Sequence, residues 1–321
     1  MSKITEIVVF SICKDSSTSE VIEWTYHYGE HVSRINRIKD VESFLNNHPE
    51  IHLLGQTNET DGVRVWFRRT PEYETPELLT NSIETNDDIK KFYCLEQRAL
   101  LVAFYNAFEG AKWLNKWSNV SPAKLDQLRV AKLVGLLTPT TYIITSKDAL
   151  SKAITDGTKF INKPIQQVSI IKYKESCYLQ YTKSIGKDEF KSLSESFFPA
   201  LFQKCIEKNL ELRVFYLDGR FYCMAICSTF DRQTADDFRR YNDKYPNRNV
   251  PYKLPVEIEE KLRLFMSRMC LNSGSIDVIL DNHGDYYFLE VNPVGQFGMV
   301  SYPCNYYLER DMARYLTIGN D

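Results

Sequence analysis

The sequence lacks the short motifs that mark the commonest nucleotide-binding and hydrolytic sites. It contains no GxxxxGK[ST] phosphate loop, no GxGxxG dinucleotide loop, no GxSxG nucleophile elbow and no HExxH zinc motif. Two histidine pairs, His27/His31 and His48/His52, have i, i+4 spacing, but a glycine interrupts the first and a proline the second. Ordinary histidines are therefore favoured over zinc ligands, and any nucleotide site must use other residues.

The chain is also poor in signals for disulfides, nucleic acid or membranes. Its eight cysteines are scattered with no CxxC, and most have apolar neighbours, which favours buried reduced thiols over a disulfide framework or zinc site. A net charge of −2 provides no global basic field. The apolar run 99–108 is too short to span a bilayer. The N-terminal stretch MSKITEIVVFSICKD has no small-residue cleavage site and is expected to be a strand. We expect a cytoplasmic protein that binds neither nucleic acid nor membrane.

What is present is enough apolar material for a packed core. The 321 residues are 43% hydrophobic and 13% aromatic, which suits one large α/β unit or two to three smaller lobes. No internal repeat or low-complexity linker separates them. The patterns predict three lobes, 1–117, 118–202 and 203–321.

The first lobe is predicted to be a small α/β unit. A strand is expected over 4–13, and a helix over 17–28 with a serine or threonine cap and Gly29 after it. A second strand is expected at 63–69. A long helix follows over 87–108, with Thr85 or Asn86 as its cap.

The second lobe opens on a helix for which Ser121 is the expected cap, Pro122 the first helical residue and Gly135 the end. A strand at 140–145, a short helix at 147–156 and a strand at 159–165 follow. The stretches VSIIKY and CYLQYTKSI predict a hairpin around Glu175 and Ser176.

The third lobe begins near Gln203. The sequence ELRVFYLDGRFYCMAIC predicts a hairpin with Asp218 and Gly219 as a two-residue primed turn. Residues 231–254 are polar and predict a long loop. A helix follows that places five apolar side chains on one face: Ile258, Leu262, Phe265, Met266 and Met269. A last hairpin is expected from SIDVIL and YYFLEV.

That last hairpin could hold a metal. If 282–285 form a four-residue loop, Asp277 lies opposite Glu290, with Cβ atoms about 5 Å apart, and Asn292 shares the same face. Two carboxylates and an amide suit Mg²⁺, which takes few protein ligands and completes its shell with phosphate and water. Spacing alone leaves the alternative open: a solvated face with Phe288 pointing outward, or a one-residue slip that breaks the pairing.

Several lysines and arginines are candidates for binding an anionic ligand. Lys163 lies in an apolar strand, and Lys124 lies in the first turn of a helix, whose positive end attracts phosphate. Taken singly, each could equally be a surface lysine. Glu211 and Arg213 would line a half-polar wall or form a surface ion pair. Arg239 and Arg240, in the polar loop, could close over a phosphate or carboxylate or simply be solvated.

The order of these parts resembles the ATP-grasp superfamily from about residue 118 to the C-terminus. The features that match are Lys124, Lys163, the hinge LFQKCI (201–206), ELRV, Asp277 and FLEVNPVGQF. The N-terminal lobe is similar to a pre-ATP-grasp domain. The tail EVNPVGQFGMVSYPCNYYLE, with VWFRR upstream, looks like the peptide maturases of graspetide (microviridin-type) systems, and looks closest to their grasp-with-spasm branch.

The resemblance implies an α/β fold with α+β lobes, in which ATP lies in the cleft between the central and C-terminal domains. It implies roles for single residues. Lys124 and Lys163 would hold the nucleotide phosphates, and Glu211 the ribose. Three residues would bind Mg²⁺: Asp277, Glu290 and Asn292. Four would meet adenine: Gln203, Lys204, Cys205 and Ile206. Arg213 and Arg239 would face the acyl phosphate or the acceptor. The stretch PIQQVSI lacks the glycines expected of a phosphate-covering loop.

The implied reaction is ATP-dependent ligation of a carboxylate to an alcohol or amine through an acyl phosphate, forming ADP and phosphate. Both partners would be side chains of one precursor peptide with a leader and an acidic, hydroxyl-rich core. A SPASM-domain partner and a homodimer are further implications. Two alternatives stay open. One is an ATP-grasp ligase that joins amino acids or modifies a protein terminus. The other is a peptide-binding protein without ATP use, against which the intact lysines and acidic residues argue.

Overall fold

The computed structural model describes residues 6–49, 51, 53, 60, 62–74, 87–153, 159–166, 170–173, 176–179, 183–227 and 247–318. The chain divides into two compact units. Unit 1 comprises 1–120, 271–273 and 293–321, and unit 2 comprises 121–270 and 274–292. The C-terminal segment thus returns to the N-terminal part of the chain. The division into three lobes stays a prediction.

Unit 1 is built on a parallel sheet with the strand order β2-β1-β3-β4. Its strands are β1 (Glu6–Phe10), β2 (Val32–Ile35), β3 (Val63–Phe67) and β4 (Lys112–Leu114). Its helices are α1 (Ser16–His27), α2 (Ile38–Asn47), α4 (Asp87–Asn106), the 3-10 turn η1 (Trp117–Asn119), α9 (Gly298–Cys304) and α10 (Leu308–Thr317). The predicted strands at 4–13 and 63–69 and both predicted helices are confirmed. The sequence patterns did not predict β2, α2, β4, α9 or α10.

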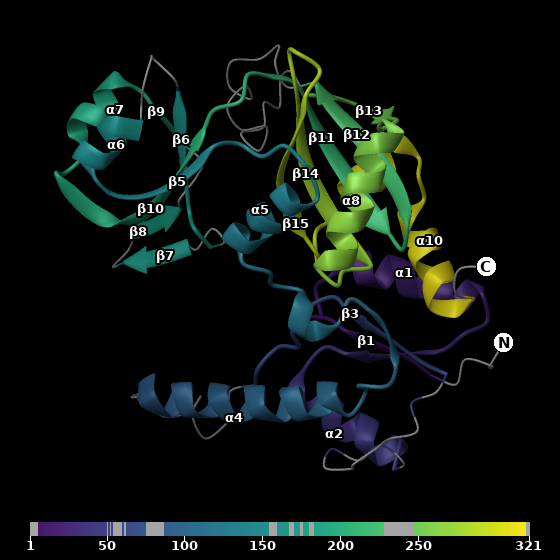
Figure 1. Cartoon of the computed structure of the whole chain (residues 1–321). Helices are drawn as coiled ribbons and strands as arrows, with labels where there is room; N and C mark the ends of the chain where they lie inside the picture. Colours follow the sequence, from purple (N-terminus) through teal and green to yellow (C-terminus); the bar gives the residue numbers. More distant parts are fainter. Residues whose placement is uncertain are drawn as a thin grey trace. The chain divides into compact units, whose positions relative to one another are not determined.

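Helices cover both faces of this sheet (Figure 1). On one side, Val8 and Phe10 pack against Phe44 of α2 and Phe104 of α4. On the other side lies α1, which packs against α10. A parallel strand buried on both faces needs apolar residues at every position, and residues 7–10 are fully buried.

The helix caps differ from the predicted ones. Asp15 caps α1 by accepting a hydrogen bond from the Thr18 N–H at 3.0 Å, so the cap is neither serine nor threonine. In unit 2, helix α5 (Lys124–Leu133) begins at Lys124, and neither Ser121 nor Pro122 has its predicted role. Ala123 is still extended and occupies the N-cap, and the Pro122 carbonyl ahead of it accepts from the Gln127 side chain at 3.1 Å. The predicted cap at Thr85 or Asn86 lies outside the described residues.

Unit 2 contains an antiparallel sheet with the order β5-β10-β6-β9. Its strands are β5 (Thr141–Ser146), β6 (Phe160–Lys163), β9 (Lys183–Ile185) and β10 (Ser196–Lys204), with helices α6 (Lys147–Ala153) and α7 (Lys187–Ser192). Residues 201–204, predicted as a hinge, are strand. The predicted hairpin is confirmed as β7 (Ile170–Tyr173) paired with β8 (Ser176–Leu179), but 183–185 pair with β6 instead of extending it.

The second sheet of unit 2 has the order β13-β12-β11-β14-β15. Its strands are β11 (Lys208–Leu217), β12 (Arg220–Cys227), β13 (Arg248–Tyr252), β14 (Ser273–Asp281) and β15 (Tyr286–Asn292), and the helix α8 (Val256–Arg268) follows β13. The primed turn is confirmed, since Asp218 and Gly219 both have positive φ. The predicted loop is wrong over 248–252, which form an edge strand. Pro251 is tolerated there because an edge strand needs fewer donors.

All eight cysteines are free thiols, but the expectation that most are buried is wrong. Cys223 and Cys304 are buried, whereas four are exposed: Cys13, Cys94, Cys177 and Cys270. Apolar neighbours in sequence do not fix which face of an element a residue takes.

Among the described helices, none is both long and apolar enough to cross a membrane.

Candidate active site

The β14–β15 hairpin pairs Asp277 with Glu290, as the sequence predicts, and it also pairs Ser275 with Asn292. The pairing next to the loop differs from the predicted one. Leu280 pairs with Tyr286, which is one residue away from the register of a four-residue loop. An irregularity between Asp277 and Val278 then restores the predicted pairing.

This irregularity decides the orientation of Phe288. Residues paired across two strands share a face, so Val278 lies with Phe288 and Asp277 with Glu290. Asp277 and Val278 are neighbours and point to opposite faces. Phe288 is accordingly fully buried and packs on Phe265 of α8, with ring centroids 4.6 Å apart. The alternative of a solvated face with an exposed Phe288 is wrong.

Ion pairs surround the two carboxylates. The Lys124 Nζ lies 3.1 Å from the Glu290 Oε2, and Arg213 pairs with Asp277. Burial by itself would raise the pKa of the Glu290 carboxyl, but the charges of Lys124, Lys163 and Arg213 together lower it below its ordinary value. We call these five residues the charge cluster. The structure thus brings together residues that lie up to 166 positions apart, from Lys124 to Glu290.

Helix α5 is fixed against β15 by a residue that the sequence analysis missed. The Gln127 side chain is buried, and its Oε1 accepts from the Val291 N–H at 2.8 Å. One turn away, Lys124 therefore faces Glu290. A second contact holds the same strand, because the Phe288 N–H donates to the Leu137 carbonyl at 2.8 Å. The signal for Gln127 was a polar residue on the helical face that also carries the buried Leu128 and Ala131.

Lys163 is the last residue of β6 and pairs with Leu201 of β10. It is half-buried. Its effect on the pKa of Glu290 shows that its charge acts on the cluster. Its predicted role in holding the nucleotide phosphates stays a prediction.

Glu211 and Arg213 have separate partners. Glu211 pairs with Lys208, and both side chains are at most 16% exposed. Arg213 pairs with Asp277, and each of these is 16% exposed. The alternative of a surface ion pair between Glu211 and Arg213 is therefore wrong, and both lie on the half-buried face of β11.

The segment predicted to meet adenine is held by its own sheet. Gln203 is buried, and its Nε2 donates to the Thr141 Oγ1 at 3.0 Å. The Lys204 N–H donates to the Thr140 carbonyl at 2.9 Å, and the Cys205 N–H to the Lys159 carbonyl at 2.8 Å. Ile206, half-buried, continues toward β11. These bonds fix the connection that leads into Glu211 and Arg213.

Some predicted residues lie outside the described part of the chain. Arg239 and Arg240 fall within 228–246 and are not placed. Residues 167–169 of the stretch PIQQVSI are not placed either.

The donor set fits Mg²⁺. Among the described residues, no three histidine, cysteine, aspartate or glutamate side chains form a metal-binding group. Asp277, Glu290 and Asn292 provide two carboxylates and an amide, enough for an ion that takes its other ligands from phosphate and water. Ser275 lies on the same face, and its buried Oγ has no hydrogen-bond partner within the described structure. An ion with bound water beside it would satisfy this hydroxyl.

No protein-family model and no curated protein matches the chain. Solved structures do match. The macrocyclase MdnC from Microcystis aeruginosa MRC, bound with precursor peptide MdnA, is 24% identical, with a TM-score of 0.77 over 97% of this chain and 99% of that one. An ATP-grasp ligase of Chryseobacterium gregarium, described as RiPP-associated and solved with ADP and a leader and core peptide, is 21% identical, with a TM-score of 0.79 over 98% and 97%.

A more distant structure agrees in architecture. The N5-carboxyaminoimidazole synthetase of Staphylococcus aureus is 12% identical, with a TM-score of 0.56 over 99% of this chain and 78% of that one. The likenesses extend over nearly the whole chain and include proteins described as ATP-grasp ligases. The chain therefore has the ATP-grasp fold that the sequence predicts.

Proposed function

We propose that this protein is an ATP-dependent ligase that closes ester or amide rings between side chains of a precursor peptide. The observation that carries the proposal is the charge cluster: three cations gathered around two facing carboxylates in an ATP-grasp fold. Its similarity to a macrocyclase bound with a precursor peptide, and to a ligase bound with ADP and a leader and core peptide, supports the substrate class.

The cluster explains how the site could receive a highly charged nucleotide. Lys124 and Arg213 are paired with carboxylates, which keeps their charges neutralised and their side chains ordered. Asp277, Glu290 and Asn292 would hold a Mg²⁺ ion. This ion would neutralise the phosphates of ATP. Lys124 and Lys163 would then turn toward phosphate oxygens.

The chemistry follows from the poor reactivity of a carboxylate. Phosphoryl transfer to it forms an acyl phosphate with a good leaving group, and the protein mainly positions groups and neutralises charge. Arg213, with Arg239, would hold the acyl phosphate or the acceptor. Glu211 would bind the ribose, and residues 203–206 the adenine. The nucleotide product is ADP.

The finer assignments are part of the proposal and are supported by the sequence resemblance. They are the grasp-with-spasm branch, a SPASM-domain partner protein, a homodimer, a cytoplasmic location and the three-domain division at 117 and 202. The tail EVNPVGQFGMVSYPCNYYLE supports the branch.

The test is a reconstitution with ATP, Mg²⁺ and a short candidate precursor peptide that carries repeated Thr/Ser and Asp/Glu. Each ring should consume one ATP, form ADP and lower the peptide mass by one water. Nucleotides are measured by chromatography and the peptide by mass spectrometry. Replacing the acidic side chain of one ring by its amide should block that ring.

Two results would contradict the proposal in different ways. AMP as the product would remove the acyl-phosphate mechanism. A peptide or protein that gains the mass of an amino acid would keep the mechanism and replace the substrate, since the fold also serves a ligase with a different product.

A further inference from the structure

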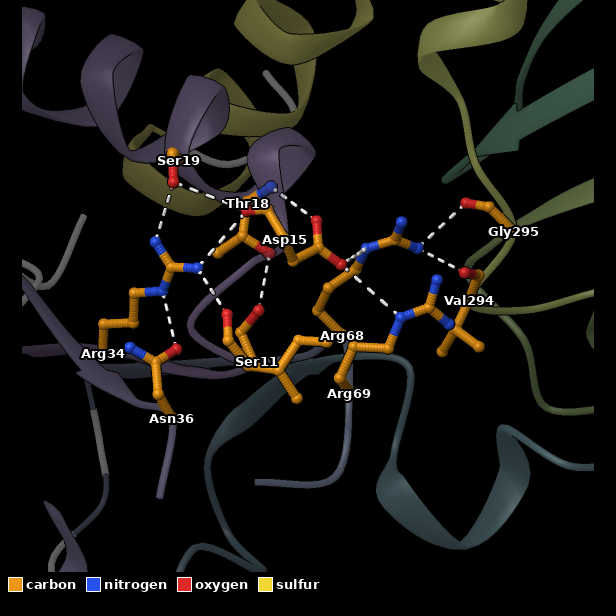
Figure 2. A network of polar contacts seen from close by, with 11 residues as sticks. Ser11, Asp15, Thr18, Ser19, Arg34, Asn36, Arg68, Arg69, Val294 and Gly295 are labelled. Carbon is orange, nitrogen blue, oxygen red and sulfur yellow. Dashed lines mark hydrogen bonds and ion pairs between the residues drawn. The ribbon is translucent and has the colours of Figure 1, made fainter. Parts of the chain in front are cut away.

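Two buried side chains donate hydrogen bonds to three consecutive backbone carbonyls directly after β15. The Asn115 Nδ2 donates to the Pro293 carbonyl at 3.1 Å. The Arg68 Nη1 donates to the Gly295 carbonyl at 2.9 Å and also to the Val294 carbonyl (Figure 2). Asn115 and Arg68 are each 2% exposed. A segment of irregular backbone is thus bonded at every residue, although it belongs to no helix or strand.

Asn115 also holds the other end of the hairpin. Its Nδ2 donates to the carbonyl and the hydroxyl of Ser273, both at 2.9 Å. Its Oδ1 accepts from the N–H groups of Asn272 and Ser273, at 3.0 and 3.1 Å. Ser273 is the first residue of β14, and Pro293 is the first residue after β15. One side chain therefore ties the two ends of the hairpin to each other.

Arg68 is itself held from several sides. Its Nε lies 3.2 Å from Asp15, the residue that caps α1, and its guanidinium lies 5.6 Å from the centre of the Phe297 ring. Figure 2 shows Asp15 lying toward both Arg68 and Arg69. Such a restrained fork can donate two hydrogen bonds in a fixed direction, which a lysine cannot reproduce.

The hairpin needs this support because of where it carries its ligands. Strand β15 is at the edge of its sheet and has a register irregularity next to Glu290. Glu290 and Asn292 lie within its last three residues. Strand ends fray, and a metal site tolerates misplacement of only about 0.5 Å.

We propose that Asn115 and Arg68 are positioning residues for the magnesium ligands. By holding Ser273 and residues 293–295, they fix the register that pairs Asp277 with Glu290 and the direction in which Asn292 leaves β15. This inference rests on the proposed function. Neither residue touches the ligands, so both act through the backbone.

The test measures metal binding directly, with Mn²⁺ in place of Mg²⁺. Free Mn²⁺ is followed by electron paramagnetic resonance in a titration of the protein with ADP present. The Asn115→Gly variant removes the side chain but keeps a residue suited to the positive φ of 57°. Its Mn²⁺ affinity should fall about tenfold, as for other residues that orient metal ligands. Asn115→Asp keeps the acceptor but turns a carboxylate oxygen toward the carbonyls of Ser273 and Pro293, so its affinity should fall at least as far.

Matched controls separate positioning from general damage. Asn305 also has a positive φ, 53°, but is exposed at the end of α9, so Asn305→Gly should bind Mn²⁺ like the parent. Arg68→Lys should weaken Mn²⁺ binding several-fold. Arg310→Lys should not, because Arg310 contacts Asp311 and the Tyr307 ring but not residues 293–295.

The outcomes are distinct. A parent that binds no Mn²⁺ with ADP would overturn the proposed function itself. A binding parent whose folded Asn115→Gly and Arg68→Lys variants match it would overturn this inference alone. So would affinity losses that only follow the folded fraction, measured by circular dichroism. If Asn115→Gly does not fold, Asn115→Asp and Arg68→Lys decide.

Discussion

At the scale of single residues, both carboxylates of the charge cluster are neutralised by cations of the same cluster. Asp277 and Glu290 face each other across a strand pair, where two carboxylates alone would repel. Lys124 and Arg213 each neutralise one of them, and Lys163 adds a third cation. The low pKa of Glu290 keeps this carboxylate ionised and able to bind a cation at neutral pH.

Glu290 is the residue whose substitution should affect ADP formation most specifically. Glu290→Gln preserves volume but removes the charge that would bind Mg²⁺, so ADP formation should fall on the order of 100-fold or more, as when a main electrostatic group is removed. The measurement is initial ADP formation at saturating ATP. Glu257→Gln on α8, which breaks only an exposed pair with Lys261, should leave the rate unchanged. A Glu290→Gln rate equal to the parent's would remove Glu290 from the site.

At the scale of elements, the site depends on how α5 meets β15. Gln127 connects them by one buried hydrogen bond, and the register irregularity lets Phe288 enter the core while Glu290 faces Lys124. A helix and a strand far apart in sequence thus present one charged face. The position of the lysine is therefore a property of the helix–strand contact.

Gln127→Leu should disturb that contact. It leaves the buried Val291 N–H without its acceptor, which costs about 1–3 kcal/mol, and it frees the start of α5. We expect a lower denaturation midpoint in urea and a several-fold higher KM for ATP, with a smaller change in kcat. Gln127→Glu retains an acceptor oxygen, so its denaturation midpoint and its KM for ATP should return most of the way to the parent values. An unchanged KM in a destabilised Gln127→Leu would show that α5 matters for stability alone.

The sequence predicted those parts of the site that depend on local patterns. Alternation along β15 gave the shared face of Glu290 and Asn292, and the turn at Asp218 and Gly219 was recognisable from its residues. The pairing of Asp277 with Glu290 was predicted correctly, but the register of residues 278–280 was wrong by one residue, because no pattern reveals a bulge. Gln127, Asn115 and Arg68 were missed, since each acts on backbone groups that are distant in sequence.

At the scale of the whole molecule, the chain has more structure than nucleotide chemistry needs. Unit 1 has its own parallel sheet and core, and β7 and β8 form a separate two-stranded sheet in unit 2. A peptide longer than the ring being closed must be held somewhere while its core reacts. We expect these parts to bind the leader.

A leader-only peptide should therefore bind in the absence of ATP. Isothermal titration calorimetry with the leader of the candidate precursor peptide should give a measurable Kd. A scrambled peptide of the same composition is the control. No heat beyond that of the control would disfavour a macrocyclase and favour a ligase of small substrates.

The edge position of β15 has a consequence for how this protein behaves at high concentration. A free edge strand offers its N–H and C=O groups to any other chain and invites aggregation. Here the Phe288 N–H is taken by the Leu137 carbonyl and the Val291 N–H by Gln127, so the contacts that hold the site also block edge-to-edge pairing. Substitutions that release these two hydrogen bonds should therefore raise the tendency of the protein to aggregate.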